Sequence, residues 1–321
     1  MINAVSKSRA GEDVCLMLSL PNHRFFYLCD CGQASDLTIS DVKNLNGLFM
    51  SHTHIDHFYN FDMLLRHQLP VTRQIVVCGP KGIAQNVQGK LLAYNWDILL
   101  TEEQAENALS YQIREITTEG IFVYELHTPK WELEHKGKLE NNILYVNEVF
   151  SVNYEILNHK TPCIAYSFVE HSKISLKDNC PLKAGEWIKL LKKSFQEKNL
   201  TQIIAVDNQL FEAKDLFQYV EEKQGYKVCF VMDHLACESN HEKIIRLCHQ
   251  ADELYIEAYY LQEELDLALK NHHSTAYLSG KVAQKSGAKK AFPIHFSRRH
   301  QSIDALKLLL EEFENGFLAV E

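Results

Sequence analysis

The sequence lacks several features that would place the protein in a specialised class. No apolar run approaches the roughly 18 residues that a membrane-spanning helix needs, so we expect no membrane partner. The first residues show no charged leader before an apolar segment, and we expect no signal peptide. Internal repeats, low-complexity segments and linkers do not stand out either. With 46% hydrophobic and 23% charged residues, the chain has the composition of an ordinary globular protein.

No two of the nine cysteines have the Cys-x-x-Cys spacing of common metal and redox motifs. Their number is odd, and some lie within apolar runs, where cysteine behaves as a small hydrophobe, as at Cys78 and Cys229. This usage is typical of a reducing compartment, so we expect a cytoplasmic protein. A zinc site at Cys29 and Cys31 is a weaker alternative, because no partner cysteines accompany them.

The chain also lacks an excess of positive charge. Its formal net charge is −9 and its pI is about 6.0. A protein that holds long nucleic acid usually has a net basic field or a basic face. The charge therefore argues against a bulky RNA substrate, although it leaves room for a local basic groove.

What the sequence does contain is a dense group of potential metal ligands, HTHIDH at residues 52–57. An apolar strand end precedes the group, and the start of a helix follows it. In extended backbone His52 and His54 point the same way, and the loop then turns Asp56 and His57 toward a neighbouring point. Imidazole and carboxylate both suit zinc. The loop predicts two adjacent metal positions, whereas the alternative is a chance cluster among 16 histidines.

Further polar residues lie at predicted strand ends. His159 closes an apolar stretch, and Asp233 ends the buried strand expected at 226–232. His295 follows the last expected strand, 290–294. A single carboxylate can hold two cations about 3.5–4 Å apart, which makes Asp233 the candidate bridge. Taken alone, His159 would be read as a surface histidine.

Hydrophobic periodicity and end signals predict the remaining elements. Thr101 and Gln104 form a capping-box pattern that predicts a helix across 102–115. Elsewhere we expect a hairpin within 13–30, strands at 120–126, 143–145 and 150–157, and helices at 241–250, 276–286 and 303–313.

Two segments near the start of the chain, residues 26–32 (FYLCDCG) and 52–57 (HTHIDH), resemble the opening of metallo-β-lactamase superfamily sequences. Three others resemble its ribonuclease Z branch, the tRNA 3′-processing endonucleases: GPKG at 79–82, HSTA at 273–276 and HFSR at 295–298. The resemblance runs from about residue 10 to residue 300. It implies an α/β fold, a four-layer αβ/βα sandwich of two mixed sheets flanked by helices.

The resemblance also implies a site for two divalent ions, most simply zinc, with manganese as the alternative. By this likeness Asp30 orients a ligand from beneath the loop, and Asp233 bridges the ions. One ion would be bound by His52, His54 and His159, and the other by Asp56, His57 and His295.

The reaction implied is hydrolysis of a phosphodiester. His273 matches the family's proton donor, and Glu257 its carboxylate partner, which favours a protonated ring; Asp56 would also orient the attacking water. The family usually has Gly-Asp-Thr or Ser-Asp-Thr where this chain has Met232-Asp233-His234. Two alternatives stay open, namely a small-molecule or cyclic-nucleotide phosphodiesterase and a silent metal-binding regulatory module.

We expect one domain over 1–321, with an insertion somewhere within 95–145. Long-arm members of the branch carry a Gly/Pro-rich arm that grips tRNA, but the segment 173–185 has one Pro and one Gly. We therefore predict no long exosite arm, and we interpret the lysines of the basic helix 187–193 as a solvated face. The substrate would be RNA or a small diester, and the family implies a homodimer.

Overall fold

The computed structural model describes residues 1–69, 72–96, 101, 104, 107–140, 143–207 and 209–319. It divides into two compact units. The large unit combines Met1–Val169 with Tyr226–Glu321, and the small unit is Glu170–Gly225. This division differs from the single domain that we expected, because residues 170–225 form a compact body of their own.

Within the described residues, the first sheet of the large unit has eight strands in the order of the chain. Its central strands, β3 to β6, are parallel neighbours, whereas both ends of the sheet are antiparallel. The strands are β1 (Asn3–Ser6), β2 (Leu16–Ser19), β3 (Phe26–Cys29), β4 (Leu45–Phe49), β5 (Gln74–Pro80), β6 (Ser110–Thr117), β7 (Gly120–His127) and β8 (Glu134–Lys138).

The second sheet, as far as the structure describes it, has six strands in the order β18-β17-β16-β11-β10-β9. Strands β16, β17 and β18 run parallel, and β11 is antiparallel to β16. Their bounds are β9 (Tyr145–Val146), β10 (Phe150–Asn158), β11 (Pro162–Glu170), β16 (Lys227–Val231), β17 (Glu253–Glu257) and β18 (Ala291–Ile294).

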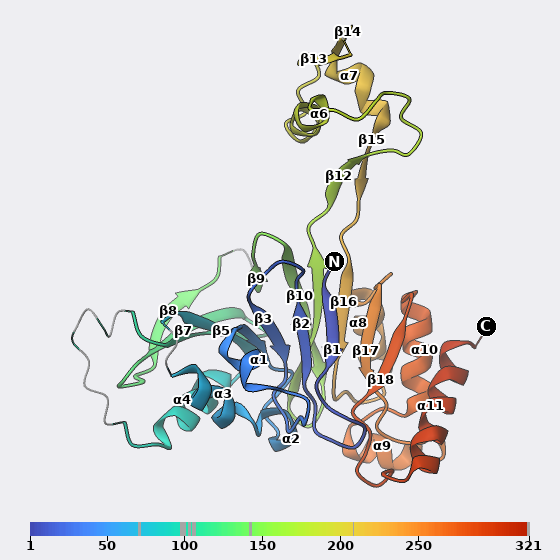
Figure 1. The fold of residues 1–321 in the computed structure, drawn as a ribbon. Helices are drawn as coiled ribbons and strands as arrows, with labels where there is room; N and C mark the ends of the chain where they lie inside the picture. Colours follow the sequence, from blue (N-terminus) through green and yellow to red (C-terminus); the bar gives the residue numbers. More distant parts are fainter. Residues whose placement is uncertain are drawn as a thin grey trace. The chain divides into compact units, whose positions relative to one another are not determined.

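Helices cover the outer face of each sheet (Figure 1). Beside the first sheet lie α1 (Ile39–Lys43), α2 (Ile55–Phe58), α3 (Phe61–Gln68) and α4 (Ile83–Leu92). Beside the second lie α8 (Glu238–Leu247), α9 (Leu265–Asn271), α10 (Ala276–Ser286) and α11 (Ile303–Phe317), with the short η2 (Gln262–Glu264) before α9. No helix within the described ranges is long and apolar enough to cross a membrane.

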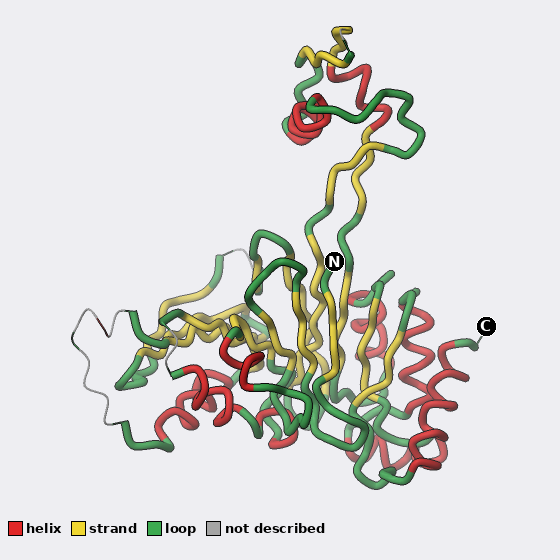
Figure 2. Tube along the Cα trace, in the orientation of Figure 1, coloured by secondary structure: helices red, strands yellow, loops and turns green. Residues whose placement is uncertain are grey.

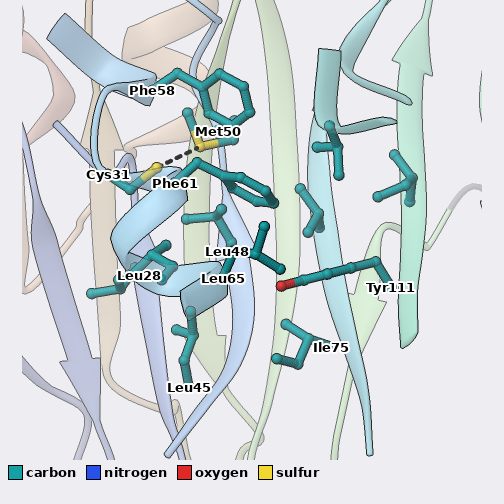
Figure 3. Packing of buried hydrophobic residues seen from close by; sticks show 14 of the residues in the cluster. Leu28, Cys31, Leu45, Leu48, Met50, Phe58, Phe61, Leu65, Ile75 and Tyr111 are labelled. Atoms are coloured by element: carbon teal, nitrogen blue, oxygen red, sulfur yellow. Dashed lines mark hydrogen bonds between the residues drawn. The ribbon is translucent and has the colours of Figure 1, made fainter. Parts of the chain in front are cut away.

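Apolar side chains fill each interface between layers. One cluster lies between the first sheet and its helices, where Phe61 and Leu65 of α3 pack near Tyr111 of β6 (Figure 3). A second cluster lies between the sheets and includes Phe49 and Phe168, whose rings meet edge to face at 4.9 Å. A third lies beneath α8, α10 and α11. The predicted αβ/βα sandwich is therefore confirmed.

Local signals explain several helix ends. The Thr275 hydroxyl accepts a hydrogen bond from the Leu278 amide and caps α10, which ends at Gly287 with a positive φ of 70°. Gly280 of α10 and Gly316 of α11 allow a close crossing, because a Cβ atom on either would clash with the backbone of the other helix. The predicted hairpin, the strand at 120–126 and the helix at 276–286 are confirmed.

The predicted helix across 102–115 is wrong in its second half, where β6 occupies Ser110–Thr117. Thr101 and Gln104 do exchange the two hydrogen bonds of a capping box, at 3.0 and 3.3 Å. Residues 102, 103, 105 and 106 lie outside the described residues. Pairing with β5 on one side and β7 on the other outweighs the local helix signal.

The small unit contains two short antiparallel strand pairs and its own apolar core (Figure 2). Trp187 and Leu191 of its helix pack against Ile204 and Leu216. It carries nine lysines and nine acidic residues, so the net charge of −9 resides in the large unit. Its elements are β12 (Lys173–Leu176), α6 (Trp187–Gln196), β13 (Ile203–Val206), β14 (Gln209–Glu212), α7 (Ala213–Leu216), η1 (Phe217–Tyr219) and β15 (Val220–Lys223).

Candidate active site

The HTHIDH loop leaves the end of β4 and turns at once into α2, whose N-cap is His54. Gly32, just after β3, makes this turn possible: a Cβ atom there would clash with the carbonyl oxygen of Asp56. The rings of His52 and His54 lie edge to face with centroids 4.3 Å apart. The loop therefore packs directly on the backbone of the neighbouring strand end, which fixes where its side chains point.

Asp30 supports the loop from below, as the resemblance implied. It is fully buried, and Oδ1 accepts a hydrogen bond from the Ser51 amide at 2.6 Å. Oδ2 accepts from the Ser51 hydroxyl at 2.7 Å and from His57 Nδ1 at 2.7 Å. Because a carboxylate can only accept, the proton of neutral His57 sits on Nδ1, and its Nε2 presents a lone pair to the site.

The first group of potential ligand atoms belongs to His52, His54, His159 and Asp233, and these atoms all lie within 4.8 Å of one another. His159 follows β10, and its Nδ1 donates to the carbonyl oxygen of His272 at 2.7 Å. That bond leaves His159 Nε2 as the free ring nitrogen, 3.6 Å from Asp233 Oδ2.

A second group, Asp56, His57 and His295, meets the same 4.8 Å limit. Asp233 lies between the two groups. Its Oδ2 is 3.5 Å from His52 Nε2 and 3.5 Å from His57 Nε2, and its Oδ1 is 2.7 Å from His295 Nδ1. All seven predicted ligands thus converge from the ends of four strands, β4, β10, β16 and β18, while their role as ligands remains a prediction.

The donor atoms at this centre are buried and lack hydrogen bonds within the part of the chain that the structure describes. These atoms are Nε2 of His52 and His57, and also Oδ1 of Asp233 and Nδ1 of His295, which form an ion pair at 2.7 Å without hydrogen-bond geometry. A buried polar atom without a partner costs about 1–3 kcal/mol, so the two Nε2 atoms in particular are expensive unless a ligand satisfies them. Imidazole and carboxylate donors of this kind fit a divalent transition-metal ion.

The electrostatics are strongly perturbed around Asp233. Burial and the neighbouring His57 lower the pKa of His52. Burial also opposes protonation of His57, but Asp233 and Asp30 outweigh it and raise the pKa of His57. Burial has the same opposing effect on His295, whose pKa the Asp233 charge raises to about 9. Without a cation, the carboxylates therefore draw protons onto the histidines beside them.

Next to Asp233 lies a third group that includes Glu257 and His273. Glu257, at the end of β17, accepts from His273 Nδ1 through Oε2 at 2.9 Å and from the His234 amide through Oε1 at 2.7 Å. Burial would raise the pKa of Glu257, but His273 and His234 lower it to about 2. Glu257 is thus a fixed anion, and it leaves His273 Nε2 as the ring nitrogen without this bond.

Two residues at the site escaped the sequence prediction. Ser51 links Asp30 to the loop, and its place directly before His52 was the only signal for it. Tyr259 stacks on His273, and nothing in the local sequence marked it. Burial, together with the Asp233 charge, raises the pKa of Tyr259 to about 12, so its hydroxyl stays protonated at neutral pH.

The architecture and the position of the histidine–aspartate centre define a protein of the metallo-β-lactamase fold. A Bacillus subtilis protein of that fold, YhfI, superposes with a TM-score of 0.56 at 13% identity, covering 98% of this chain and 93% of that one. The short form of human tRNase Z gives 0.54 at 18% identity, covering 93% and 94%. No family model matches the chain.

Sequence similarity to curated proteins points to one group within this fold, the ribonuclease Z proteins. A ribonuclease Z of Deinococcus radiodurans is 25% identical over 294 residues, which are 88% of this chain and 85% of that protein. A ribonuclease Z of Rippkaea orientalis is 26% identical over 332 residues, covering 97% and 91%. The chain thus has the metallo-β-lactamase fold and is similar in sequence to ribonuclease Z proteins over most of its length.

Proposed function

We propose that the protein is a metal-dependent endoribonuclease that hydrolyses a phosphodiester bond, as in tRNA 3′-end processing. The observation that carries this proposal is the meeting of two potential metal-ligand groups at Asp233, directly beside the His273–Glu257 pair. Such a site combines cation binding with a histidine that can move a proton. The curated relatives named ribonuclease Z support the same reaction.

Two ions would be held here, and zinc suits the donor set best. His52, His54 and His159 would bind one, Asp56, His57 and His295 the other, and Asp233 would contact both. When bound, such ions lower the pKa of water and neutralise charge that grows on phosphate oxygens.

The chain's own residues supply orientation and proton transfer. Asp30 holds His57 in the tautomer whose Nε2 can bind a cation. Asp56, at the second group, would orient the attacking water. Glu257 fixes Nδ1 of His273, so Nε2 would protonate the leaving oxygen as the P–O bond breaks. A ribose hydroxyl is a poor leaving group, and it needs that proton.

RNA is favoured over a small diester by a groove in the small unit. Four lysines line the groove, Lys173 of β12 and Lys189, Lys192 and Lys193 of α6, together with one acidic residue, Glu186. Several lysines that line one groove can contact successive phosphates of an RNA backbone, whereas a small diester has a single phosphate. We therefore replace our interpretation of these lysines as a solvated face with an RNA-binding surface.

The test compares two substrates, a precursor tRNA with a 3′ trailer and bis(p-nitrophenyl) phosphate, with the metal-loaded protein. Trailer cleavage that His273→Ala abolishes would support the endoribonuclease. Turnover of the small diester alone would favour a small-molecule phosphodiesterase. Inactivity on both, with metal bound, would favour a silent regulatory module.

The lysine groove has a separate test. The combined Lys189→Glu, Lys192→Glu and Lys193→Glu variant should weaken tRNA binding and reduce its salt dependence, because phosphate contacts are lost. Its turnover of bis(p-nitrophenyl) phosphate should match the wild type. Lys307→Glu, on the exposed face of α11, is the matched control. Equal tRNA binding by both variants would count against the groove.

We further propose a homodimer and a cytoplasmic location. All nine cysteines are free thiols, which fits a reducing compartment. Ile55 and Tyr59, beside the site, are 76% and 54% exposed and offer apolar surface to a second copy. Light scattering on the wild type and on Ile55→Ser would test this, because a monomer in both would refute the dimer.

A further inference from the structure

Tyr259 lies two residues after Glu257, and its ring covers one face of His273. The two rings are stacked, with centroids 3.9 Å apart and planes only 7° from parallel. The same phenol ring meets His295 edge to face at 5.0 Å. One aromatic ring therefore contacts both the candidate proton donor and a candidate metal ligand.

The hydrogen bond to Glu257 restrains the ring plane of His273 only in part. It holds Nδ1 at 2.9 Å, but a hydrogen bond tolerates modest changes of angle and the χ2 torsion of histidine is broad, so the ring can still tilt. Tilting would swing Nε2 away from the leaving oxygen. A flat ring stacked at 3.9 Å prevents the tilt, since it would drive an imidazole edge into the phenol face.

Tyr259 is itself held in place, so its ring can restrain the ring of His273. Its carbonyl oxygen accepts a hydrogen bond from the Ser297 amide at 3.1 Å. Tyr260 packs edge to face against it with centroids 4.9 Å apart. The residue is therefore held at its backbone and at the edge of its ring.

We propose that Tyr259 is a positioning residue that fixes the ring plane of His273 for delivery of a proton to the leaving oxygen. The inference rests on the proposed phosphodiester cleavage. In that step water forms the new P–O bond, the old P–O bond breaks, and Nε2 of His273 gives its proton to the departing oxygen. Tyr259 should therefore matter for a ribose leaving group, and hardly at all for nitrophenolate, which leaves without a proton.

Three variants test the role. Tyr259→Phe keeps the stacked ring, and Tyr259→Leu removes it. Phe292→Leu is the matched control, because Phe292 stacks on Tyr255 in the same sheet with centroids 4.8 Å apart. General acids contribute about 10²–10⁴-fold, so Tyr259→Leu should lower kcat for precursor tRNA by roughly 10–100-fold. Its turnover of bis(p-nitrophenyl) phosphate should stay within about threefold, and the other two variants should resemble the wild type on both.

Two kinetic results would overturn the inference. One is an equal loss on both substrates in Tyr259→Leu, which would indicate damage to the whole centre. The other is a loss in Tyr259→Phe as large as in Tyr259→Leu, which would assign the effect to the hydroxyl.

A second readout is independent of activity and separates this inference from the proposed function. In labelled protein, the stacked phenol should shift the His273 ring-proton resonances upfield, in the wild type and in Tyr259→Phe. Tyr259→Leu should abolish the shift. Unchanged His273 resonances in Tyr259→Leu would refute the positioning role, whereas a wild type inactive on both substrates with the shift intact would refute only the proposed reaction.

Discussion

Replacing Asp30 by asparagine should weaken one metal position without unfolding the protein. The substitution conserves shape, and asparagine tolerates the positive φ of 56° at this residue. The amide oxygen of the new side chain can still accept from the Ser51 amide, as Oδ1 of Asp30 does. The new NH₂ group takes the place of Oδ2, which in the wild type accepts from His57 Nδ1 at 2.7 Å.

The magnitude follows from the tautomer of His57. An NH₂ group donates, so it is satisfied only if Nδ1 of His57 carries no proton, and the ring proton then sits on Nε2. Nε2 is the atom that faces Asp233 at 3.5 Å, and a protonated nitrogen cannot bind a cation. Loss of such a carboxylate–histidine contact costs about 10–100-fold in metal affinity, or about 1.4–2.7 kcal/mol.

The assay is metal content at a series of buffered free-zinc concentrations. The position formed by Asp56, His57 and His295 should fill at about 10–100-fold higher free zinc in Asp30→Asn, whereas the position of His52, His54 and His159 should change little. Asp36→Asn is the control, because Asp36 is half exposed and pairs with Arg9 at the surface. Filling of both positions at the wild-type zinc concentration would refute the tautomer argument.

Three further outcomes are expected. Removal of metal by a chelator should lower the melting temperature, and added zinc should restore it, because the ions bind only the folded site; no response to zinc would contradict the site. Burial, with His234 and Lys285, lowers the pKa of His241 to about 4. Stability should therefore fall as pH drops from about 6.5 toward 4, where only the unfolded chain takes up this proton, and His241→Gln should flatten that slope in urea titrations. Gly280→Ala should destabilise the folded protein by about 1–3 kcal/mol, because the added methyl group clashes with α11. Gly89→Ala, which points into open space on α4, should stabilise it by about 0.5–1 kcal/mol. Equal effects of the two variants in thermal unfolding would contradict the close crossing of α10 and α11.

The parts of the site that the sequence predicted are those with short-range signals. The HTHIDH loop carries four candidate ligands in six residues, and the likeness to a known family located Glu257 and His273. Tyr259 could not be predicted, because stacking on His273 depends on how two loops pack and leaves no pattern in either. Ser51 acts through Asp30, far away in the sequence but adjacent in space.

The fold was predictable where hydrophobic periodicity and end signals agree, as at Thr275 and Gly287 around α10. It was not predictable at 110–117, because the capping pair Thr101 and Gln104 indicated a helix there. The segment forms β6 instead, paired with β5 and β7. Residues 170–225 were missed for another reason. Their strands are only four residues long, and their core depends on Trp187 meeting residues beyond position 200.

The route of the chain into and out of the small unit has a consequence for how this protein can change. The chain departs after Val169 of β11 and returns at Lys227 of β16, and these two residues are direct partners across one antiparallel pair. The segment 170–226 thus begins and ends beside one pair of strand partners, which a tight β-turn could also connect. Recombination could lengthen, shorten or exchange this segment in a single event without shifting any of the candidate ligands, so this segment and the candidate active site are free to evolve separately.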